Sequence, residues 1–286
     1  MTWAIVADSS CNLKGYEPST PQTVYASAPL KINVGTTEYA DDDTLDIQAF
    51  IQDMTSTSAA TSSACPSVGE WAELLRSAEN VIAIPISTGL SGSYDAASTA
   101  CDMVMAEGGH NIHLLDSRAA GAKLEYLVVL IDRYLTYNPE ATFEEVCNYA
   151  DSIEDHSQVL YSLSTYDNLV KAGRFPKLAG LVANKLNIRM LGSATDQGTM
   201  TILGPSRGEK KSLAKILSAM EDDGFDGGDV FIDHVNNETG AQKLADMITT
   251  AHPTTTCHIM PCRALCSYYA ELNGLIIGYG CSSPWS

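Results

Sequence analysis

Short apolar runs alternate with amphipathic segments along the first half of this chain. Each run stops in small or polar residues, as the buried strands of a parallel sheet do. In the segments between them, apolar residues recur every three or four positions, which is typical of helices that cover a sheet. This pattern predicts strands over 3–7, 81–86 and 111–115, extended segments over 23–39, and helices over 44–54, 66–75, 94–100, 119–137 and 143–154.

The second half of the chain has a more mixed pattern, which indicates an α+β domain with partly antiparallel strands. We expect the domain boundary near 151–159, giving domains of residues 1–155 and 156–286. The pattern predicts strands over 159–163, 229–234 and 275–278, a hairpin formed by 186–191 and 199–203, helices over 212–220 and 239–249, and two short helices that flank 173–176.

The composition describes a globular protein with a strong negative charge. Of its 286 residues 45% are hydrophobic, and the formal net charge is −18. Nucleic acid and anionic membranes are poor partners for such a chain, because both require clustered Lys and Arg. No apolar run reaches the ~18 residues of a membrane span, and the first residues lack the basic start of a signal peptide. We expect a cytoplasmic protein whose charge provides solubility or, alternatively, attracts a basic partner protein.

The eight cysteines give no metal motif. They are scattered along the chain, and no pair has C-x-x-C spacing. Cys262 and Cys266 have the spacing of one helix face, but no further Cys or His pair lies near them to complete a zinc site. We therefore expect reduced thiols and no bound metal.

The segment 84–94, IPISTGLSGSY, joins an apolar strand to a helix through small and hydroxyl residues. Free N–H groups at the start of a helix attract anions, and the helix dipole adds to this attraction. Ser87, Ser91 and Ser93 supply further donors, and Gly92 lets a ligand approach the backbone. The loop is thus a candidate seat for a phosphate or a carboxylate.

Polar residues also follow other predicted strands. Asp8 and Ser9 come after the first strand, and Ser63 and Asp116 lie at two further candidate strand ends. The carboxyl ends of parallel strands share one sheet edge, where ligands bind in doubly wound folds, so we expect these residues to gather beside the 84–94 loop. Each group taken alone is also typical of a helix cap.

Two enzymatic interpretations of the loop have less support. The residues around Ser91 lack the final glycine of a G-x-S-x-G nucleophile elbow, and none of the six histidines has a persuasive acidic partner in its sequence context. Neither a P-loop nor a G-x-G-x-x-G motif is present for a nucleotide. Arg118 is the only cation beside these loops, so a carboxylate suits the site better than a phosphate, which usually recruits more positive charge.

A series of motifs resembles the DegV family of bacterial fatty-acid-binding proteins, the B-type subunits that serve fatty acid kinases. The resemblance runs in order through nearly the whole chain. IVADSSCNL at 5–13 is similar to I-V-T-D-S-[ST]-x-D-L, and ISTGLSGSY at 86–94 is similar to L-S-S-G-L-S-G-[ST]-Y. Further matches are SACPSVGEW at 63–71, LDSR at 115–118, LVKAGR at 169–174, LNIRML at 186–191 and SRGEKKSL at 206–213.

The resemblance implies an α/β protein of two domains, a parallel-sheet α/β/α domain and an α+β domain with a mixed sheet. It implies a non-enzymatic carrier that needs no cofactor and holds a long-chain fatty acid, such as palmitate, stearate or oleate, non-covalently between the domains. The carboxylate would be held by the hydroxyls of Ser63 and Ser91 and by nearby backbone amides. The expected ligand-binding set is Ser63, Ser91, Gly92, Ser93, Ser87, Asp8 and Ser9.

The resemblance also implies a separate fatty acid kinase that phosphorylates the bound acid. Arg207 stands at the position of a family arginine associated with that step, although it is equally well interpreted as a surface cation. The family's C-terminal histidine is replaced by Gly280, so a lipid sensor without a kinase is an alternative, as is an enzyme that uses the serine loop. For Arg174 we favour a helix-capping role after Gly173 over a ligand role.

Overall fold

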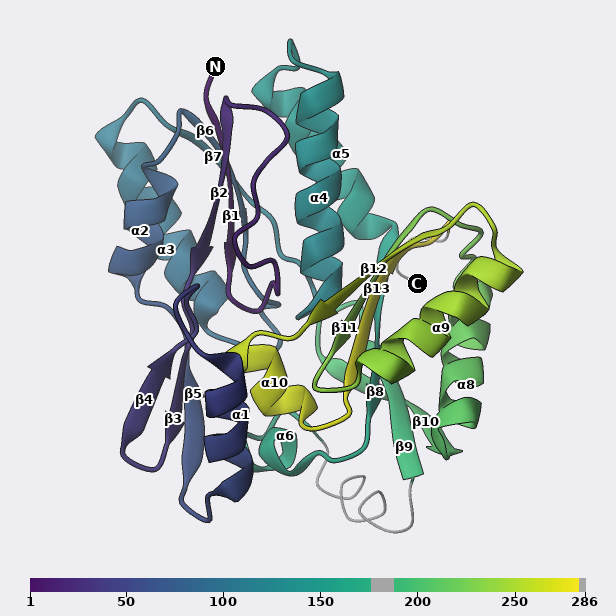
Figure 1. Cartoon of the computed structure of the whole chain (residues 1–286). Coiled ribbons are helices and arrows are strands. Elements are labelled where there is room, and N and C mark those ends of the chain that lie inside the picture. Colours follow the sequence, from purple (N-terminus) through teal and green to yellow (C-terminus); the bar gives the residue numbers. More distant parts are fainter. Residues whose placement is uncertain (176–187, 283–286) are drawn as a thin grey trace.

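The computed structural model describes residues 1–175 and 188–282, and it has an α/β fold with a parallel sheet in the N-terminal region and a mixed sheet in the C-terminal region (Figure 1). The expected fold class is therefore confirmed. The expected division at 155/156 stays a prediction. The helix expected after Pro176 lies outside the described residues.

The first sheet contains four parallel strands in the order β2-β1-β6-β7. Every residue of β1 and β6 is buried, because helices cover both faces of the sheet (Figure 1). The strands are β1 (Trp3–Asp8), β2 (Thr23–Ala28), β6 (Asn80–Ile84) and β7 (Asn111–Leu114), and the helices are α2 (Val68–Leu75), α3 (Ser93–Glu107), α4 (Ala122–Tyr137) and α5 (Phe143–Asp155).

Two helix starts in this region follow from local chemistry. Ser67 and Glu70 form the expected capping box of α2. The helix predicted over 119–137 begins later, as α4 at Ala122, because the preceding residues form a loop with Gly121 at φ 77°. A side chain at Gly121 would also meet Ile276 at 2.9 Å. The close approach of α4 to the C-terminal sheet thus requires glycine there.

A small antiparallel sheet was not anticipated as a separate unit. Its strands, in the order β4-β3-β5, are β3 (Lys31–Val34), β4 (Thr37–Ala40) and β5 (Thr61–Ala64), and α1 (Ile47–Ser56) accompanies them. The prediction that Ser63 ends a strand of the parallel sheet is wrong, because Ser63 lies within β5 and pairs with Ile32 of β3. The polar sequence TSSA shows no apolar run that would reveal this strand.

The C-terminal sheet has six strands in the order β10-β9-β8-β13-β11-β12, and only the β11–β12 pair is parallel. The predicted hairpin is present as β9 and β10. Two elements were missed, the half-buried edge strand β12 and the seven-residue helix α10. The elements are β8 (Ser157–Leu163), α6 (Asp167–Lys171), β9 (Ile188–Ala194), β10 (Met200–Arg207), α8 (Glu209–Asp222), β11 (Asp229–His234), α9 (Glu238–Ala251), β12 (Thr256–Pro261), α10 (Ala264–Ala270) and β13 (Leu275–Gly280).

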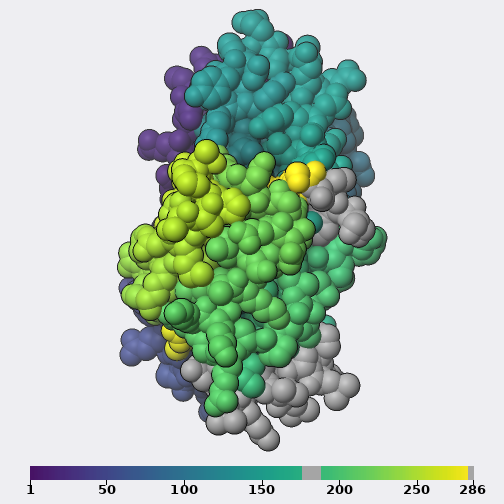
Figure 2. All heavy atoms as spheres, turned by 90° about the vertical axis from the view of Figure 1, so that its right-hand side faces the viewer, coloured from purple at the N-terminus to yellow at the C-terminus, as the bar shows by residue number. Residues whose placement is uncertain are grey.

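The two sheets are joined by elements that contact both regions. Helix α4 packs against β1 on one side and against β11 and β13 on the other. Helix α10 packs against α1 and β3, and its start is held by the buried Asp41, which accepts the N–H groups of Ala264 and Leu265 and pairs with Arg263. Figure 2 shows the molecule from the right-hand side of Figure 1. The green atoms of α8 and the yellow-green atoms of α9 form the surface below the teal atoms of α4 and α5.

Candidate functional site

A cavity lies where the serine loop, the small sheet, α10 and the C-terminal sheet meet. The empty space between its walls, together with the open mouth, is about 640 Å³. Most of its wall is apolar. We call this space the cavity, and its lining is Leu30, Ser63, Ile86, Leu90, Ser91, Ala120, Tyr161, Leu163, Leu169, Arg174, Met200, Leu265, Cys266, Tyr269, Ala270 and Ile276.

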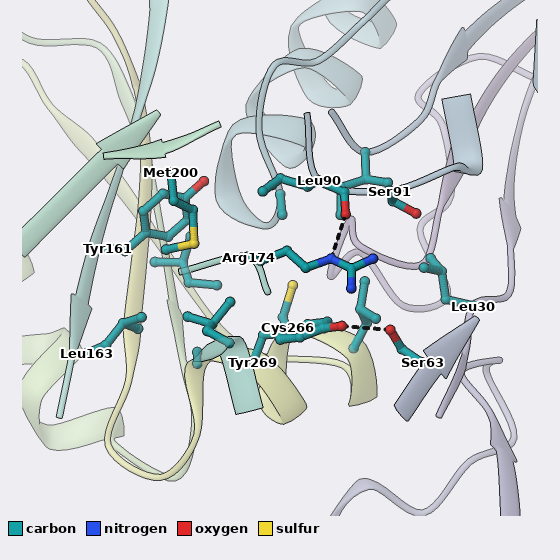
Figure 3. A pocket seen from close by; sticks show the side chains of 16 residues that line it. Leu30, Ser63, Leu90, Ser91, Tyr161, Leu163, Arg174, Met200, Cys266 and Tyr269 are labelled. Carbon is teal, nitrogen blue, oxygen red and sulfur yellow. Dashed lines mark hydrogen bonds between the residues drawn. The ribbon is translucent and has the colours of Figure 1, made fainter. Parts of the chain in front are cut away.

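Polar groups gather at one end of the cavity (Figure 3). Ser63 Oγ lies 2.7 Å from the hydroxyl of Tyr269, and either atom can be the donor. Arg174 Nε donates to the Leu90 carbonyl over 3.1 Å, which brings the guanidinium beside Ser91 (Figure 3). The result is an apolar space with three hydroxyl groups, those of Ser63, Ser91 and Tyr269, and a cation at its polar end.

Ser91 is oriented by the turn that precedes α3. The N–H groups of Leu90 and Ser91 both donate to the Ser87 carbonyl, which tightens the turn. Ser91 Oγ accepts the N–H of Ser93 over 3.2 Å. Because that hydrogen bond uses the oxygen only as an acceptor, the hydroxyl proton of Ser91 remains available to donate to an anion in the cavity.

Asp8 organises the same loop from behind. Its carboxylate accepts the Ile86 N–H over 3.0 Å and the Ser93 hydroxyl over 2.6 Å, and it also accepts hydrogen bonds from Ser10. Burial raises the pKa of Asp8, while these hydrogen bonds oppose the shift. The Ser93 hydroxyl therefore points toward Asp8 and does not line the cavity.

Ser9 and Ser87 are also engaged within the protein. Ser9 Oγ accepts the Leu30 N–H, and Ser87 Oγ donates to the Gly198 carbonyl over 2.8 Å. Ser87 thereby fixes the tip of the β9–β10 hairpin against the serine loop. Like Asp8 and Ser93, these two serines lie outside the cavity lining. Asp8, Ser87 and Ser93 hold the loop in shape through these hydrogen bonds, and Ser9 holds the backbone at Leu30. Ligand contact by any of the seven expected residues stays a prediction.

Gly92 lines an open groove that adjoins the cavity. We call this space the outer groove; it is lined by Thr88, Gly89, Leu90, Ser91, Gly92, Ala172, Gly173, Arg174, Phe175, Thr199 and Met200. Ser91 and Arg174 line both spaces. The polar end of the cavity is consequently close to the protein surface, at the N-terminus of α3.

The helix-capping role expected for the Gly173–Arg174 pair is confirmed. Gly173 has φ 74°, its N–H donates to Val170, and the Arg174 N–H donates to Leu169, which is the pattern of a Schellman motif. Arg174 Nη1 also donates to the Ala172 carbonyl. Arg174 also lines the cavity, so a ligand role in addition to capping stays open. The sequence signal for this arrangement was the Gly173–Arg174 pair, because a glycine that ends a helix fixes the backbone of the residue after it.

The sequence model described as "Uncharacterised protein, DegV family" matches residues 2–278. The chain belongs to the DegV family. A DegV domain-containing protein of Streptococcus pyogenes is 36% identical over 280 residues, which cover 98% of this chain and 99% of the relative.

Two solved DegV-type structures closely resemble this DegV protein. The fatty acid kinase B3 protein of Streptococcus pneumoniae, crystallised with linoleic acid, has a TM-score of 0.94 and 35% identity, and the match covers 99% of this chain and 100% of the other. A DegV family protein of Eubacterium eligens, loaded with heptadecanoic acid, has a TM-score of 0.92 and 30% identity, and the match covers 98% and 100% of the two chains.

Arg207 and Gly280, the two positions that the resemblance links to a kinase, are both absent from the cavity lining. Arg207 is exposed at the end of β10. Gly280 ends β13, and a side chain there would meet the Tyr126 hydroxyl at 2.4 Å. Tyr126 of α4 thus occupies the space next to Gly280, and a larger residue at this position would require Tyr126 to move.

Other kinds of site find no support within residues 1–175 and 188–282. No group of three or more His, Cys, Asp or Glu side chains in this part of the chain could hold a metal ion. None of the described helices is long and apolar enough to cross a membrane.

Proposed function

We propose that this DegV protein binds a long-chain fatty acid non-covalently, with the acyl chain in the cavity and the carboxylate at Ser63, Ser91 and Arg174. The observation that carries the proposal is the pairing of an apolar cavity with three hydroxyl groups and a cation at one end. A carboxylate accepts several hydrogen bonds and benefits from a guanidinium. The N-terminus of α3, beside Gly92, adds a favourable dipole.

The two ends of the ligand contribute differently to the binding free energy. A long-chain acid has on the order of fifteen methylenes, and each contributes ~0.8 kcal/mol when buried. The acyl chain therefore supplies most of the affinity, even after the entropic cost of association. A neutral hydrogen bond at the carboxylate contributes only ~1 kcal/mol. The polar end mainly decides which end of the lipid lies near the surface.

Substitution of Ser91 tests this division. We expect Ser91→Ala to weaken fatty acid binding about fivefold or more while leaving the affinity for the matched alkanol nearly unchanged, because the alkanol lacks the anionic acceptor. Ser77→Ala, at an exposed site away from the cavity, serves as the control and should change neither affinity. Equal losses for acid and alkanol in Ser91→Ala would contradict carboxylate recognition by this residue.

The same geometry supports a carrier over an enzyme. Each of the six histidines belongs to the described residues, and none of them lines the cavity, so Ser91 has no imidazole base. The carboxylate would lie next to the outer groove, where a separate kinase has access to it. We infer that the protein presents the acid to a fatty acid kinase, with Arg207 contributing to the docking surface.

A reconstitution with a cognate kinase and ATP tests the carrier role. We expect acyl phosphate to form with the wild-type protein and to decrease in Arg207→Ala, with fatty acid affinity unchanged; Lys211→Ala provides a nearby charge control. Absence of acyl phosphate with wild-type protein and an active kinase would favour the alternative of a lipid sensor, for which the replacement of the family's histidine by Gly280 is the supporting observation.

A further inference from the structure

A small hollow adjoins the cavity on the side away from the polar end. Its empty space, including its opening, is about 180 Å³, and Tyr161, Leu163 and Met200 line both the hollow and the cavity. In Figure 3 these three residues lie on the opposite side from Ser63 and Leu30. An acyl chain that starts at the polar end and follows the cavity therefore reaches the hollow with its last carbons.

The hollow forms where one side chain is missing from a face of the C-terminal sheet. Tyr161 of β8, Gly192 of β9 and Ile202 of β10 lie directly opposite one another in the strand pairing, so they share that face. Gly192 adds no side chain to the row, and all three residues line the hollow. A carbon added at Gly192 would meet the Thr201 carbonyl oxygen at 2.6 Å. The pairing of β9 with β10 thus keeps the gap open.

The wall of the hollow is almost entirely apolar. The Tyr166 hydroxyl is engaged, because it donates to the Leu163 carbonyl over 2.6 Å and accepts the Met190 N–H over 2.7 Å. The Tyr161 hydroxyl is buried and does not open onto the space. Apolar spaces without hydrogen-bonding groups stay dry and bind apolar ligands. The methyl end of an acyl chain is a ligand of this kind.

Two parts of this wall differ in how easily they yield. The rings of Tyr166 and Phe175 stack with their centroids 4.8 Å apart, and both residues are buried. Met200, at the start of β10, is only partly buried, and it lines the cavity, the hollow and the outer groove. Its unbranched thioether side chain changes shape more readily than an aromatic ring. Met200 is therefore the part of the wall that an entering chain displaces most easily.

The outer groove is a poorer route for the end of the chain. It is open, and its lining includes the polar side chains of Thr88, Ser91 and Thr199. Methylenes that entered it would stay partly in water and would lose much of the free energy of burial. The hollow is the better continuation of the cavity.

We propose that the hollow receives the methyl end of the acyl chain and that Met200 controls its entry, so that the two together set the preferred chain length. This inference rests on the proposed function and specifies its ligand. Each methylene that becomes buried tightens binding about fourfold. A chain that is too long for the hollow meets the stacked rings of Tyr166 and Phe175, and its further methylenes add little.

A series of saturated fatty acids tests the inference. Affinities for the acids from dodecanoate to eicosanoate, lengthened one carbon at a time, would be measured by displacement of a fluorescent fatty acid. In wild-type protein we expect each carbon to tighten binding about fourfold up to a limiting length, beyond which the affinity no longer rises.

Two variants should move this limiting length in opposite directions. Ile202 lines the hollow but not the cavity, so Ile202→Phe should fill the hollow, shorten the limiting length and weaken binding of the longer acids about fourfold or more. Met200→Ala should widen the entry and lengthen it. Met260→Ala is the control, because Met260 is a partly buried methionine of β12 that lines neither space; the limiting length should stay that of wild type.

A cross-linking measurement on the wild-type protein covers the case in which a variant does not fold. A stearate with a diazirine next to its methyl end would be bound and irradiated; the carbene left after loss of nitrogen inserts into a neighbouring C–H bond. We expect the label on peptides that contain Met190 or Ile202.

Three results would overturn the inference while fatty acid binding upholds the proposed function. They are a label on Thr88 or Gly89 of the outer groove, a limiting length that is the same in wild type and Ile202→Phe, and an equal loss for all acids in that variant. Failure of the wild-type protein to bind any of the acids would contradict both the inference and the proposed function.

Discussion

Ser63, Ser91, Arg174 and Tyr269 reach the polar end of the cavity from four different elements or loops. Tyr269 is bound to Ser63 across 206 residues of sequence, and Arg174 is bound to Leu90 across 84. If Ser63 donates its single proton to a carboxylate, Tyr269 must donate to Ser63, because a hydroxyl group has only one hydrogen. Tyr269 is then a positioning residue that orients Ser63 toward the ligand.

Substitution of Tyr269 by Phe tests this relay. We expect Tyr269→Phe to weaken binding of fatty acid about threefold to tenfold and to leave alkanol binding nearly unchanged. In the Ser63→Ala background the same substitution should have little further effect, because the hydroxyl that it orients is absent. Full additivity of the two losses in a double-mutant cycle would contradict the relay.

The charge of Arg174 has its own signature. We expect Arg174→Met to weaken fatty acid binding about tenfold, since a hydrogen bond between charged groups is lost, and to leave the affinity for the alkanol within about twofold. The side chain is exposed, so added salt should reduce the wild-type preference for the acid. If the preference for the acid over the alkanol changed neither with salt nor in Arg174→Met, the role of Arg174 would be helix capping alone.

At the scale of elements, the β9–β10 hairpin is docked onto the serine loop through close backbone contact. A side chain at Gly89 would meet the Gln197 carbonyl oxygen at 2.8 Å and Gly198 at 2.9 Å. Because those atoms are backbone, they cannot swing aside as a flexible side chain would. The hairpin and the loop thus fit only with glycine at position 89.

We expect Gly89→Ala to lower the free energy of unfolding by about 1–3 kcal/mol and to weaken fatty acid binding, since the loop that carries Ser91 must move. Gly69→Ala provides the control, because the nearest atom to its added carbon is 3.9 Å away and alanine favours the helix. Urea unfolding and ligand titration of both variants check this prediction. Unchanged stability in Gly89→Ala would show that the contact yields readily.

The elements differ in how far they could be predicted from sequence. Strands β1 and β6 were predictable because they are uniformly apolar and fully buried. Strand β5 was not, because its sequence TSSA is polar and only its pairing with β3 makes it a strand. Ser63 and Ser91 were predicted from strand-end chemistry and from the family motifs, and both line the cavity, while their contact with a ligand stays a prediction. Tyr269 carries no local signal, because its role arises from a contact that only the folded chain creates.

At the scale of the molecule, a buried carboxyl pair connects the N-terminal and C-terminal regions. Asn12 donates its backbone N–H to Glu125 and its side-chain amide to Asp233. The second oxygens of the two carboxyl groups, Glu125 Oε2 and Asp233 Oδ1, have no hydrogen-bond partner assigned by geometry among the described residues. Burial raises the pKa of Asp233 well above its ordinary value and that of Glu125 to about 7. The two groups are therefore expected to share a proton.

This pair predicts a pH dependence of stability with a definite sign. A carboxyl group whose pKa is higher in the folded than in the unfolded protein stabilises the fold at acidic pH, and this contribution is lost as the pH rises through the folded pKa. We expect the pair's contribution to the free energy of unfolding to fall as the pH rises from about 4.5 to about 7. Asp233→Asn should remove much of that fall. The free energy of unfolding of the variant, relative to that of the wild type, should therefore rise with pH. A difference that is constant with pH would contradict proton sharing.

The central claim is that the cavity holds a free fatty acid, and mass spectrometry of the purified protein tests it most directly. The protein would be denatured in organic solvent, the extract analysed for lipids, and the peptide containing Ser91 examined for added mass. We predict a long-chain fatty acid in near-stoichiometric amount and an unmodified peptide. An acyl group covalently attached to Ser91, or a protein that neither carries nor takes up fatty acid, would contradict the account.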